Sequence, residues 1–361
     1  MTSKVLVTGG AGFIGSNFIR YALKAHPEWH IINLDKLTYA GNLANLGDVT
    51  DHPRYHFVKG DIADRDLVNS LFSGSKNQEL TPHMVVNFAA ESHVDRSILD
   101  AAPFIETNVK GTQVLLEAAR AHWLSDLTKN QQPGTRNLFL QVSTDEVYGS
   151  IEAGKFSETS PLCPNSPYAA SKAAADLLCR AYGRTYGLPV VITRCCNNYG
   201  PYQFPEKLIP LMLHRALSDQ PLPLYGDGQN VREWIHVEDH CRALDAVLQR
   251  GNAGEVYHIG SGEERKNIEL VELLCDLIEP KTKNQAPRAN IRFIKDRPGH
   301  DLRYALDCGK LRQLGWRPAF SLQEGLRKTV DWYLDHQPWV ERITSGEYQE
   351  YSARVYERGW R

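Results

Sequence analysis

The stretch Thr8-Gly9-Gly10-Ala11-Gly12-Phe13-Ile14-Gly15 decides the fold of this chain. It lies between an apolar run at residues 5–8, typical of a strand, and a helical pattern over Phe13–Ala25. Its glycines at 9, 12 and 15 give the spacing G-x-x-G-x-x-G. A pyrophosphate needs a tight turn, a backbone free of side chains and open N–H groups at a helix N-terminus. The stretch therefore predicts a dinucleotide-binding turn; the alternative is a glycine turn that binds no cofactor.

An acidic residue stands at the end of the second expected strand. Asp35 lies twenty residues beyond Gly15. A carboxylate there accepts hydrogen bonds from the ribose hydroxyls of NAD and repels the 2′-phosphate of NADP. The neighbouring Lys36 leaves NADP open, and Asp61, just beyond the third expected strand, is placed to meet the adenine. The predicted cofactor is NAD.

Strand and helix patterns alternate through the first half of the chain. Strands are expected at residues 5–8, 31–34, 55–58, 84–88, 138–142 and 189–194, and long helices at 13–25, 103–122 and 166–186. This alternation predicts an α/β fold, a Rossmann-like doubly wound parallel sheet. Beyond Tyr199 proline and glycine cluster, although a helix at 236–249 and a strand at 256–259 could rejoin the first sheet.

These patterns divide the 361 residues into two domains. An NAD-binding Rossmann domain is expected at 1–198 plus about 236–262. A smaller mixed α/β domain, interrupted in sequence, is expected at about 199–235 and 263–345 and would bind the substrate. Residues 346–361 make a C-terminal tail without a motif, and the polar residues 125–136 an exposed loop.

The composition narrows the class of protein. Hydrophobic residues make up 42 % of the chain and charged residues 23 %, ordinary values for a soluble globular protein. The net charge of −2 does not favour nucleic acid. Seven cysteines without a Cys-x-x-Cys spacing fit neither a disulfide framework nor a zinc site. With no leader pattern and no run long enough to span a bilayer, we expect a cytoplasmic protein without a membrane partner.

Tyr168 and Lys172 form a Tyr-x-x-x-Lys pair on one face of the expected helix 166–186. A tyrosine is a poor base at neutral pH, but an ammonium and a nicotinium ring could stabilise its phenolate by roughly 4 kcal/mol. The tyrosinate would then remove a hydroxyl proton while a hydride leaves for NAD. Alone, the pair is more often an incidental helix surface; behind a dinucleotide turn it indicates catalysis.

The fifth expected strand ends in Ser143-Thr144-Asp145-Glu146-Val147-Tyr148-Gly149. In such sheets ligands bind at the carboxyl ends of the strands. Thr144 could hydrogen-bond a substrate oxygen beside Tyr168. The adjacent acids Asp145 and Glu146 suit a reaction that needs a proton donor and a proton acceptor besides the tyrosine. The alternative is a solvated acidic turn.

Several motifs together resemble one family. They are the glycine turn, Ala-Ala-Glu-Ser-His-Val-Asp-Arg-Ser at 89–97, Ser-Thr-Asp-Glu-Val-Tyr-Gly at 143–149, Tyr-x-x-x-Lys at 168–172, Asn-Asn-Tyr-Gly-Pro at 197–201 and Asp-Arg-Pro-Gly-His at 296–300. From the first strand to about residue 335, the chain closely resembles the dTDP-glucose 4,6-dehydratases, which are extended short-chain dehydrogenases/reductases. The resemblance implies a lyase that removes water from dTDP-glucose with internally recycled NAD.

The resemblance also implies a role for each site residue. Catalysis would rest on Thr144, Asp145, Glu146, Tyr168 and Lys172. NAD would be lined by Gly9, Gly12, Phe13, Ile14, Gly15, Asp35, Lys36, Leu37, Thr38, Asp61, Ile62, Ala89, Ala90, Glu91, Ser92, Thr107, Tyr168, Lys172 and Asn198. The nucleotide sugar would be held by His93, Thr144, Asn197, Lys207, Leu208, Pro223, Leu224, Tyr225, Arg232, Asn267, Asp296, Arg297, Pro298, Gly299 and His300.

Some of these residues also fit simpler interpretations. Lys207, Arg232, Arg297 and His300 are the donors that a diphosphate needs, whereas Asn267 could instead be a helix N-cap. His236 and His240 have a spacing that can bind a metal. No third ligand is evident beside them, so no metal is expected.

The implied reaction is redox-neutral. Tyr168 takes the proton from the sugar O4 while the C4 hydride leaves for NAD, and the resulting ketone acidifies C5–H. Glu146 removes that proton, protonated Asp145 donates to the departing C6 hydroxyl, and the hydride returns to C6. Two close carboxyls tend to split their pKa values, which suits one acid and one base. The sequence leaves open which is which.

Other interpretations remain at this point. A 4-epimerase or a decarboxylase of another nucleotide sugar could use the same scaffold, although an epimerase has no need for Asp145 and Glu146. A non-catalytic dinucleotide sensor has no need for Tyr168 and Lys172. The sequence does not separate dTDP from UDP.

By resemblance, the helices at 103–122 and 166–186 pair with their copies in a four-helix interface of a homodimer. The apolar residues expected there are Val114, Leu115, Ala118, Leu177, Leu178 and Ala181.

Overall fold

The computed structural model describes residues 3–73, 81–124, 136–281, 287–345 and Tyr348. Apart from Arg136 and Tyr348, the expected loop at 125–136 and the expected tail at 346–361 lie outside the described residues. Within the described part of the chain, no helix is long and apolar enough to cross a membrane.

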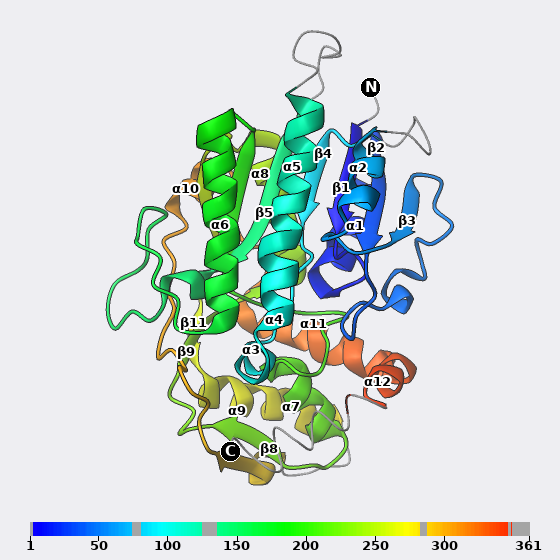
Figure 1. Ribbon diagram of the computed structural model, residues 1–361. Helices are drawn as coiled ribbons and strands as arrows, with labels where there is room; N and C mark the ends of the chain where they lie inside the picture. The colour runs from blue at the N-terminus through cyan, green and yellow to red at the C-terminus, as the bar shows by residue number, and fades with distance from the viewer. Residues whose placement is uncertain (1–2, 74–80, 125–135, 282–286, 346–347, 349–361) are drawn as a thin grey trace.

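Seven parallel strands form the central sheet, in the order β10-β6-β5-β4-β1-β2-β3 (Figure 1). They are β1 Ser3–Thr8, β2 Trp29–Asp35, β3 Tyr55–Lys59, β4 Met84–Asn87, β5 Leu138–Thr144, β6 Val190–Cys195 and β10 Val256–Ile259. The predicted fold class is confirmed, and β10 does rejoin the sheet, with Val256 opposite Ile192 of β6. The strand order reverses between β1 and β4, where doubly wound sheets bind their ligands.

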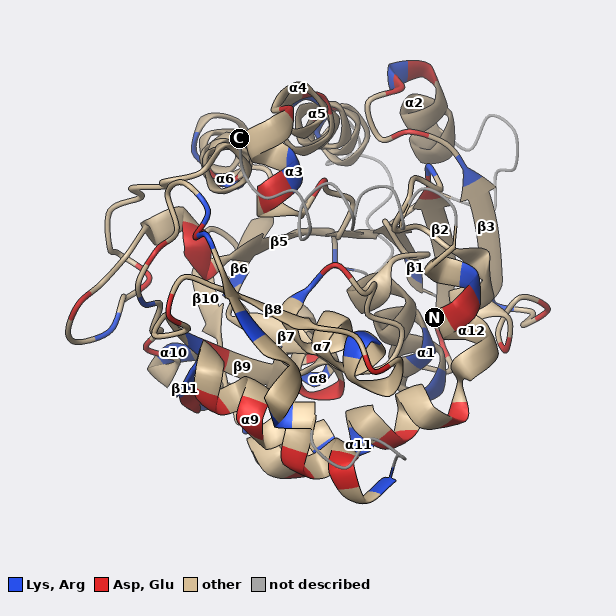
Figure 2. Cartoon of the chain, turned by 90° about the horizontal axis from the view of Figure 1, so that it is seen from below, with Lys and Arg blue, Asp and Glu red and all other residues tan. Residues whose placement is uncertain are grey.

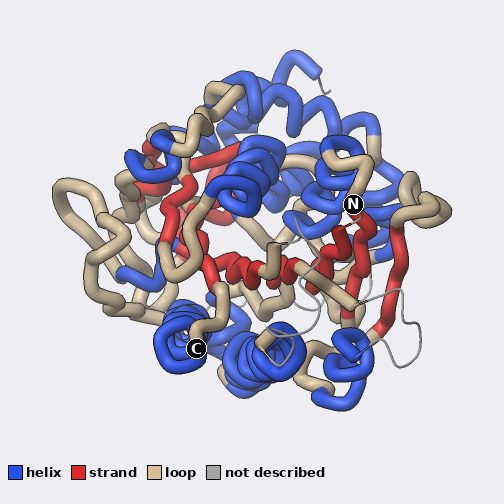
Figure 3. The backbone as a smooth tube through the Cα atoms, turned by 90° about the horizontal axis from the view of Figure 1, so that it is seen from above, coloured by secondary structure: helices blue, strands red, loops and turns tan. Residues whose placement is uncertain are grey.

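Helices cover both faces of this sheet (Figure 3). On one face lie α1 (Phe13–Ala25) and α8 (Val237–Arg250); on the other lie α2 (Arg65–Ser73), α5 (Thr112–Trp123) and α6 (Pro167–Tyr186). Val5 and Val7 of β1 belong to the core beneath α1, and Leu6 to the core beneath α2 and α5. Successive residues of a strand face opposite sides, so a strand that is apolar throughout needs helices on both.

The structure divides the expected helix 103–122 into parts. α4 (Ala102–Phe104) leads into a π-helical segment, Ile105–Gly111, and α5 follows it. Asn108 is buried in the π segment, and its side chain bonds the backbone N and O of Glu91 and the hydroxyl of Ser171. The irregular turn therefore ties α6 to the loop after β4, as π segments often do near functional sites.

A smaller domain is built mainly from the later chain. β7 (Asn197–Tyr199), β9 (Val231–His236) and β11 (Glu264–Lys266) form one sheet, and β8 (Leu222–Tyr225) pairs with β12 (Ile291–Ile294). The helices α7 (Leu208–Leu217), α9 (Asn267–Ile278), α11 (Leu322–Asp335) and α12 (Gln337–Ile343) enclose a separate core that includes Leu213, Leu224, Leu274 and Val330. Acidic and basic residues are spread along α9 and α11 (Figure 2).

The two-domain division stays a prediction, and one segment packs differently from its expectation. The sequence assigns residues 263–345 to the smaller domain, yet Leu306, Leu311 and Trp316 lie in the core of the first. There α10 (Gly309–Gln313) packs against β10. Leu306 also forms a β-bridge with Phe156, so long-range pairing holds this segment on the sheet domain.

Candidate active site

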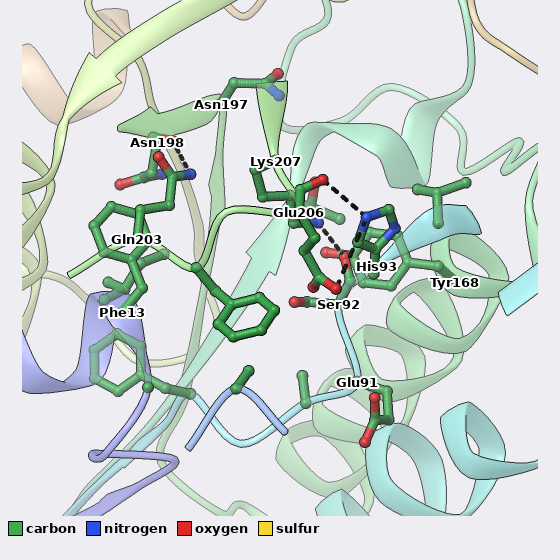
Figure 4. Close-up of a pocket in the computed structure, with 18 of the residues that line it drawn as sticks. Phe13, Glu91, Ser92, His93, Tyr168, Asn197, Asn198, Gln203, Glu206 and Lys207 are labelled. Carbon is green, nitrogen blue, oxygen red and sulfur yellow. Dashed lines mark hydrogen bonds and ion pairs between the residues drawn. The ribbon is translucent and has the colours of Figure 1, made fainter. Parts of the chain in front are cut away.

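A cavity of about 410 Å³ lies between the carboxyl ends of the central strands and the smaller domain. All five residues predicted to be catalytic line it. So do the predicted cofactor residues except Leu37, and the predicted substrate residues except Asp296, Pro298 and Gly299. Figure 4 shows Tyr168, His93, Lys207 and Asn198 converging on this space from different elements.

The residues outside the lining still bear on it. The backbone N of Leu37 donates to Asp35 Oδ1 at 2.8 Å. Asp296 Oδ1 lies 2.7 Å from His300 Nδ1 and orients that ring. At Gly299, with φ of 66°, a Cβ would lie 2.8 Å from the carbonyl oxygen of Asn165, so only glycine fits that turn. Leu37 and Asp296 therefore hold the lining residues Asp35 and His300 in place.

The glycine turn is shaped to admit a pyrophosphate. At Gly9, a Cβ would lie 2.7 Å from the backbone N of Ala89, and at Gly15 it would lie 2.4 Å from the carbonyl O of Gly9. α1 begins at Phe13 with no side chain capping its N-terminus. First-turn N–H groups have no partner within their own helix, so those of Phe13 and Ile14 suit a phosphate. The residues present therefore fit a dinucleotide.

Asp35 ends β2 and Asp61 lies just beyond β3, where a carboxylate would favour ribose hydroxyls over a 2′-phosphate. Asp35 is buried, and Oδ2 accepts from the backbone N of Ala11 at 2.9 Å. A carboxylate has about four acceptor positions, so it can still receive ribose hydroxyls. Lys36 Nζ lies 2.7 Å from Asp61 Oδ2. Its ammonium is therefore already paired with a carboxylate and is not positioned to bind a 2′-phosphate.

α6 presents Tyr168 and Lys172 one turn apart. The Ser166 hydroxyl caps the helix by accepting from the backbone N of Ala169 at 3.1 Å. Lys172 Nζ donates to the carbonyl O of Val142 at 2.7 Å, which holds the ammonium beside the end of β5. Burial lowers the pKa of Lys172 and raises that of Tyr168 well above its ordinary value. Without further positive charge, the tyrosine keeps its proton.

Asp145 and Glu146 stand in different electrostatic surroundings. Both open a short 3₁₀-helix, Asp145–Tyr148, directly after β5. Burial raises the pKa of Asp145 well above its usual range, and the carboxyls of Glu146 and Glu233 raise it further. Burial also raises the pKa of Glu146, but Arg297, Lys207 and Arg232 oppose that rise. Asp145 therefore retains a proton more readily than Glu146.

Three cations gather in the outer cavity. Lys207 Nζ donates to the carbonyl O of Ser92 at 2.7 Å, and Arg297 Nη1 bonds Asp95 Oδ1 at 3.1 Å. Arg232 donates to the carbonyl O of Asp301 at 2.8 Å. Among the described residues, Arg297 Nε is buried without a hydrogen-bond partner. These donors suit a diphosphate.

Asn267 is not the N-cap of α9, because Lys266 occupies that position and Asn267 is the first helical residue. Its side-chain Oδ1 is buried and, within the described part of the chain, has no hydrogen-bond partner. Asn267 also lines the cavity.

The two histidines considered as metal ligands, His236 and His240, instead form hydrogen bonds with other residues. His240 Nδ1 lies 2.7 Å from Asn198 Oδ1, and His236 accepts from the backbone N of Glu238 at the start of α8. Burial lowers the pKa of His240 to about 3 and that of His236 to about 4. His240 therefore orients Asn198 as a neutral ring.

Several lining residues escaped the sequence analysis: Asp95, Cys195, Gln203, Phe204, Glu206, Trp234 and Tyr304. Glu206 is buried, and its Oε2 lies 3.1 Å from Arg96 Nε. Its carbonyl O lies 3.0 Å from His93 Nε2 (Figure 4). The position of Glu206 directly before the expected substrate residue Lys207 is the only sequence signal we find that it lines the cavity. Cys195 and Trp234 lie in strands, where a cavity-facing side chain looks like core.

Comparisons with known proteins show which family this chain belongs to. The family model described as GDP-mannose 4,6 dehydratase matches residues 6–329. A dTDP-glucose 4,6-dehydratase of Xanthomonas campestris pv. campestris (strain B100) is 52 % identical, covering 95 % of this chain and 97 % of the relative.

Two solved structures place the chain among related enzymes. DesIV, a dTDP-glucose 4,6-dehydratase from Streptomyces venezuelae with NAD and TYD bound, has a TM-score of 0.84 and 52 % identity, covering 94 % of this chain and 99 % of its own. A UDP-glucose 4-epimerase from Thermus thermophilus, in complex with NAD, has a TM-score of 0.79 and 31 % identity, covering 92 % and 99 %. The chain therefore belongs to the nucleotide-sugar dehydratases of the extended short-chain dehydrogenase/reductase group, and within them to the dTDP-glucose 4,6-dehydratases.

Proposed function

We propose that this protein dehydrates dTDP-glucose to dTDP-4-keto-6-deoxy-glucose, as a lyase with NAD as its cofactor. The observation that carries this proposal is the meeting of two pairs of side chains in one cavity: Tyr168 with Lys172, and Asp145 with Glu146. The first pair suits oxidation of an alcohol, and the second suits removal of water. Relatives of this chain with that activity support the choice of substrate.

NAD would lie between the glycine turn and Asp35. When bound, it would accept the hydride from C4 and later return it to C6. Tyr168, whose pKa burial raises, would gain from a positive nicotinamide ring the charge that it lacks in the protein alone. Tyr168 then accepts the O4 proton, assisted by the Lys172 ammonium and by Thr144 at the end of β5. These assignments follow the positions of the side chains around the cavity.

Asp145 and Glu146 would carry out the elimination of water. We assign Asp145 as the acid that donates to the C6 hydroxyl, because its burial and its carboxyl neighbours keep it protonated. We assign Glu146 as the base that removes the C5 proton, because Arg297, Lys207 and Arg232 favour its charged form. The two carboxyls titrate as a pair. In this assignment the pair holds one proton, and that proton is on Asp145.

The diphosphate would lie against Lys207, Arg232 and Arg297. His300, held by Asp296, and the Asn267 amide complete the polar contacts. Pro223, Leu224 and Tyr225 line the far end with apolar surface that suits a base. The thymidine base itself is proposed from the activity of the relatives.

A 4-epimerase is the main competing activity, because an epimerase shares this fold. It is not favoured, because epimerisation gives no task to the two acids, Asp145 and Glu146, that line the cavity with the tyrosine. A sensor without catalysis would leave Tyr168 and Lys172 without a task. Incubation with dTDP-glucose, followed by the ultraviolet absorbance of the alkali-treated 4-keto sugar, distinguishes the three. A panel with UDP-, GDP- and CDP-glucose tests the base.

We also propose a homodimer through helices α5 and α6, but three of the six residues expected in its interface are ruled out. Val114, Leu115 and Ala118 cannot contribute, because all three are buried between α5 and the sheet of their own chain. Leu177 on α6 is 53 % exposed and Ile105 54 %, while Leu99, at the end of α3 (Val94–Leu99), is 41 % exposed. These three exposed apolar residues belong to neighbouring helical segments, where a second copy would cover them. A cytoplasmic location is proposed as well, consistent with seven free cysteines.

A further inference from the structure

A line of buried polar side chains runs behind the cavity. It consists of Asp176 on α6, Arg194 on β6, Tyr148 at the end of the 3₁₀-helix and His258 on β10, none of them more than 5 % exposed. Arg194 stands opposite Ser143 of β5 on one side and His258 on the other. Residues in register on neighbouring strands project on the same face, so the sheet itself brings Arg194 and His258 together.

Arg194 connects two of these elements. Its Nε donates to Asp176 Oδ2 at 2.9 Å, and its Nη1 donates to the Tyr148 hydroxyl oxygen at 2.6 Å. The guanidinium also lies over the Tyr148 ring, 4.8 Å from its centroid. The rigid fork of a guanidinium can hold two acceptors at a fixed separation, which a lysine cannot do.

The hydrogens in this line have defined directions. His258 Nδ1 lies 3.0 Å from the carbonyl O of Asp307, which can only accept, so Nδ1 carries the hydrogen. Burial lowers the pKa of His258 to about 3, so the ring is neutral and Nε2 is an acceptor. The Tyr148 hydroxyl, 2.6 Å from Nε2, therefore donates to His258 and accepts from Arg194. Both ends of the hydroxyl are used.

Two members of the line, Asp176 and Tyr148, lie in the two elements that carry the catalytic pairs. Asp176 follows Lys172 by one turn of α6, the helix that also carries Tyr168. Tyr148 closes the four-residue 3₁₀-helix that Asp145 and Glu146 open. A helix of one turn has little rigidity of its own, so the position of its acids depends on what holds its far end.

Building on the proposed function, we propose that Arg194 is a positioning residue that fixes the Asp145–Glu146 pair relative to the Tyr168–Lys172 pair, through Tyr148 and Asp176. Oxidation at C4 and elimination across C5 and C6 act on neighbouring atoms of one sugar. Catalytic groups must be held to within about 0.5 Å for such chemistry. A bridge from the oxidising helix to the eliminating turn meets that requirement.

Tyr148→Phe tests the bridge with little change of shape. The ring keeps its stacking on Phe156, with centroids 4.8 Å apart, while Arg194 and His258 lose their shared partner. Reduced nicotinamide should form at close to the parent rate and then accumulate, because elimination slows by about 10- to 100-fold. The apparent KM should stay near that of the parent. Rapid-mixing absorbance and uptake of solvent deuterium at C5 measure the two steps separately.

Tyr257→Phe is the matched control. Tyr257 is also a buried tyrosine, on β10, and its hydroxyl accepts one hydrogen bond, from the backbone N of Asn252 at 2.9 Å. Loss of folded enzyme lowers the amplitude of all steps together, so a purely structural defect does not change the ratio of oxidation to elimination. This control should show no accumulation.

Arg194→Lys provides a second variant should Tyr148→Phe not fold. It keeps the positive charge beside Asp176 but cannot serve both partners, and it should give the same accumulation. If either folded variant keeps the parent's ratio of the two steps, as Tyr257→Phe should, the bridge is overturned while the proposed function stands. If the parent itself does not dehydrate dTDP-glucose, the proposed function fails and this inference with it.

Discussion

Replacing Glu146 by Gln isolates the elimination step from the oxidation step. Glutamine keeps the size and shape of the side chain but cannot remove the C5 proton. Losing a positioned base typically slows a step by about 10²–10⁴-fold, which corresponds to about 3–5 kcal/mol in the barrier. The Glu146 carboxylate also raises the pKa of Tyr168, so removing it lowers that pKa. Oxidation at C4 should therefore proceed at least as readily as in the parent.

The expected result is a split between the two steps. Stopped-flow absorbance should show reduced nicotinamide accumulating, and the quenched sugar should be 4-keto-glucose that still carries its C6 hydroxyl. Tyr168→Phe, as the comparison, should give no reduced nicotinamide because oxidation itself fails. Turnover of Glu146→Gln at the parent rate would refute the assignment of Glu146 as the base. Failure before any reduced nicotinamide forms would assign Glu146 to substrate binding or structure instead.

Three further predictions concern the cofactor, the acid and the assembly. Because Asp35 is held by backbone N–H groups and Lys36 is paired with Asp61, cofactor-stripped enzyme should regain activity with NAD and much less with NADP; equal activation by both would contradict this. Since Glu233 helps to raise the pKa of Asp145, Glu233→Gln should move the alkaline limb of the elimination rate to lower pH, and an unmoved limb in single-turnover pH profiles would count against Asp145 as the acid. Leu177→Glu should convert a dimer to a monomer in light scattering, with Leu302→Glu, a comparably exposed leucine, as control; a monomeric parent would remove the proposal.

A fourth prediction follows from the hydrogen bonds behind the glycine turn. Trp339 Nε1 of α12 donates to Asn45 Oδ1 at 2.9 Å, and Asn45 Nδ2 donates to the carbonyl O of Ala11 at 2.9 Å. One such bond is worth about 1 kcal/mol, so Trp339→Phe should weaken NAD binding by about fivefold. Equilibrium dialysis against NAD, with Trp332→Phe as the control, measures the change. Unchanged affinity would show that α12 does not support the turn.

The sequence predicts the parts of this protein that depend on local patterns. β1 can be predicted because Val5, Leu6 and Val7 are apolar in succession. The start of α1 can be predicted because a glycine turn precedes it. The site can be predicted where functional groups end a strand or follow it directly, as Thr144 ends β5 and Asp145 follows it. In such cases one short segment contains both the element and its chemistry.

Other features depend on contacts between distant residues. The π segment Ile105–Gly111 looks like an ordinary helix in the sequence. Its wider turn accompanies the hydrogen bonds of Asn108 with Glu91 and Ser171, which lie elsewhere in the chain. Val114 and Leu115 look available for an interface until the sheet covers them. Arg194 looks like one polar residue in a strand until β10 places His258 beside it. Which of Asp145 and Glu146 keeps its proton depends on Glu233 and on cations from the smaller domain.

The central claim is that a hydride leaves C4 and returns to C6 of the same sugar within one turnover. dTDP-glucose deuterated at C4 tests it, with the product analysed by mass spectrometry and NMR. The account predicts deuterium at C6 of the product, and in heavy water a solvent-derived label at C5 placed there after Glu146 removes the original proton. A mixture of labelled and unlabelled substrate should give no exchange of deuterium between molecules. Loss of the C4 deuterium to solvent, or its return to C4 in an epimerised sugar, would contradict the account.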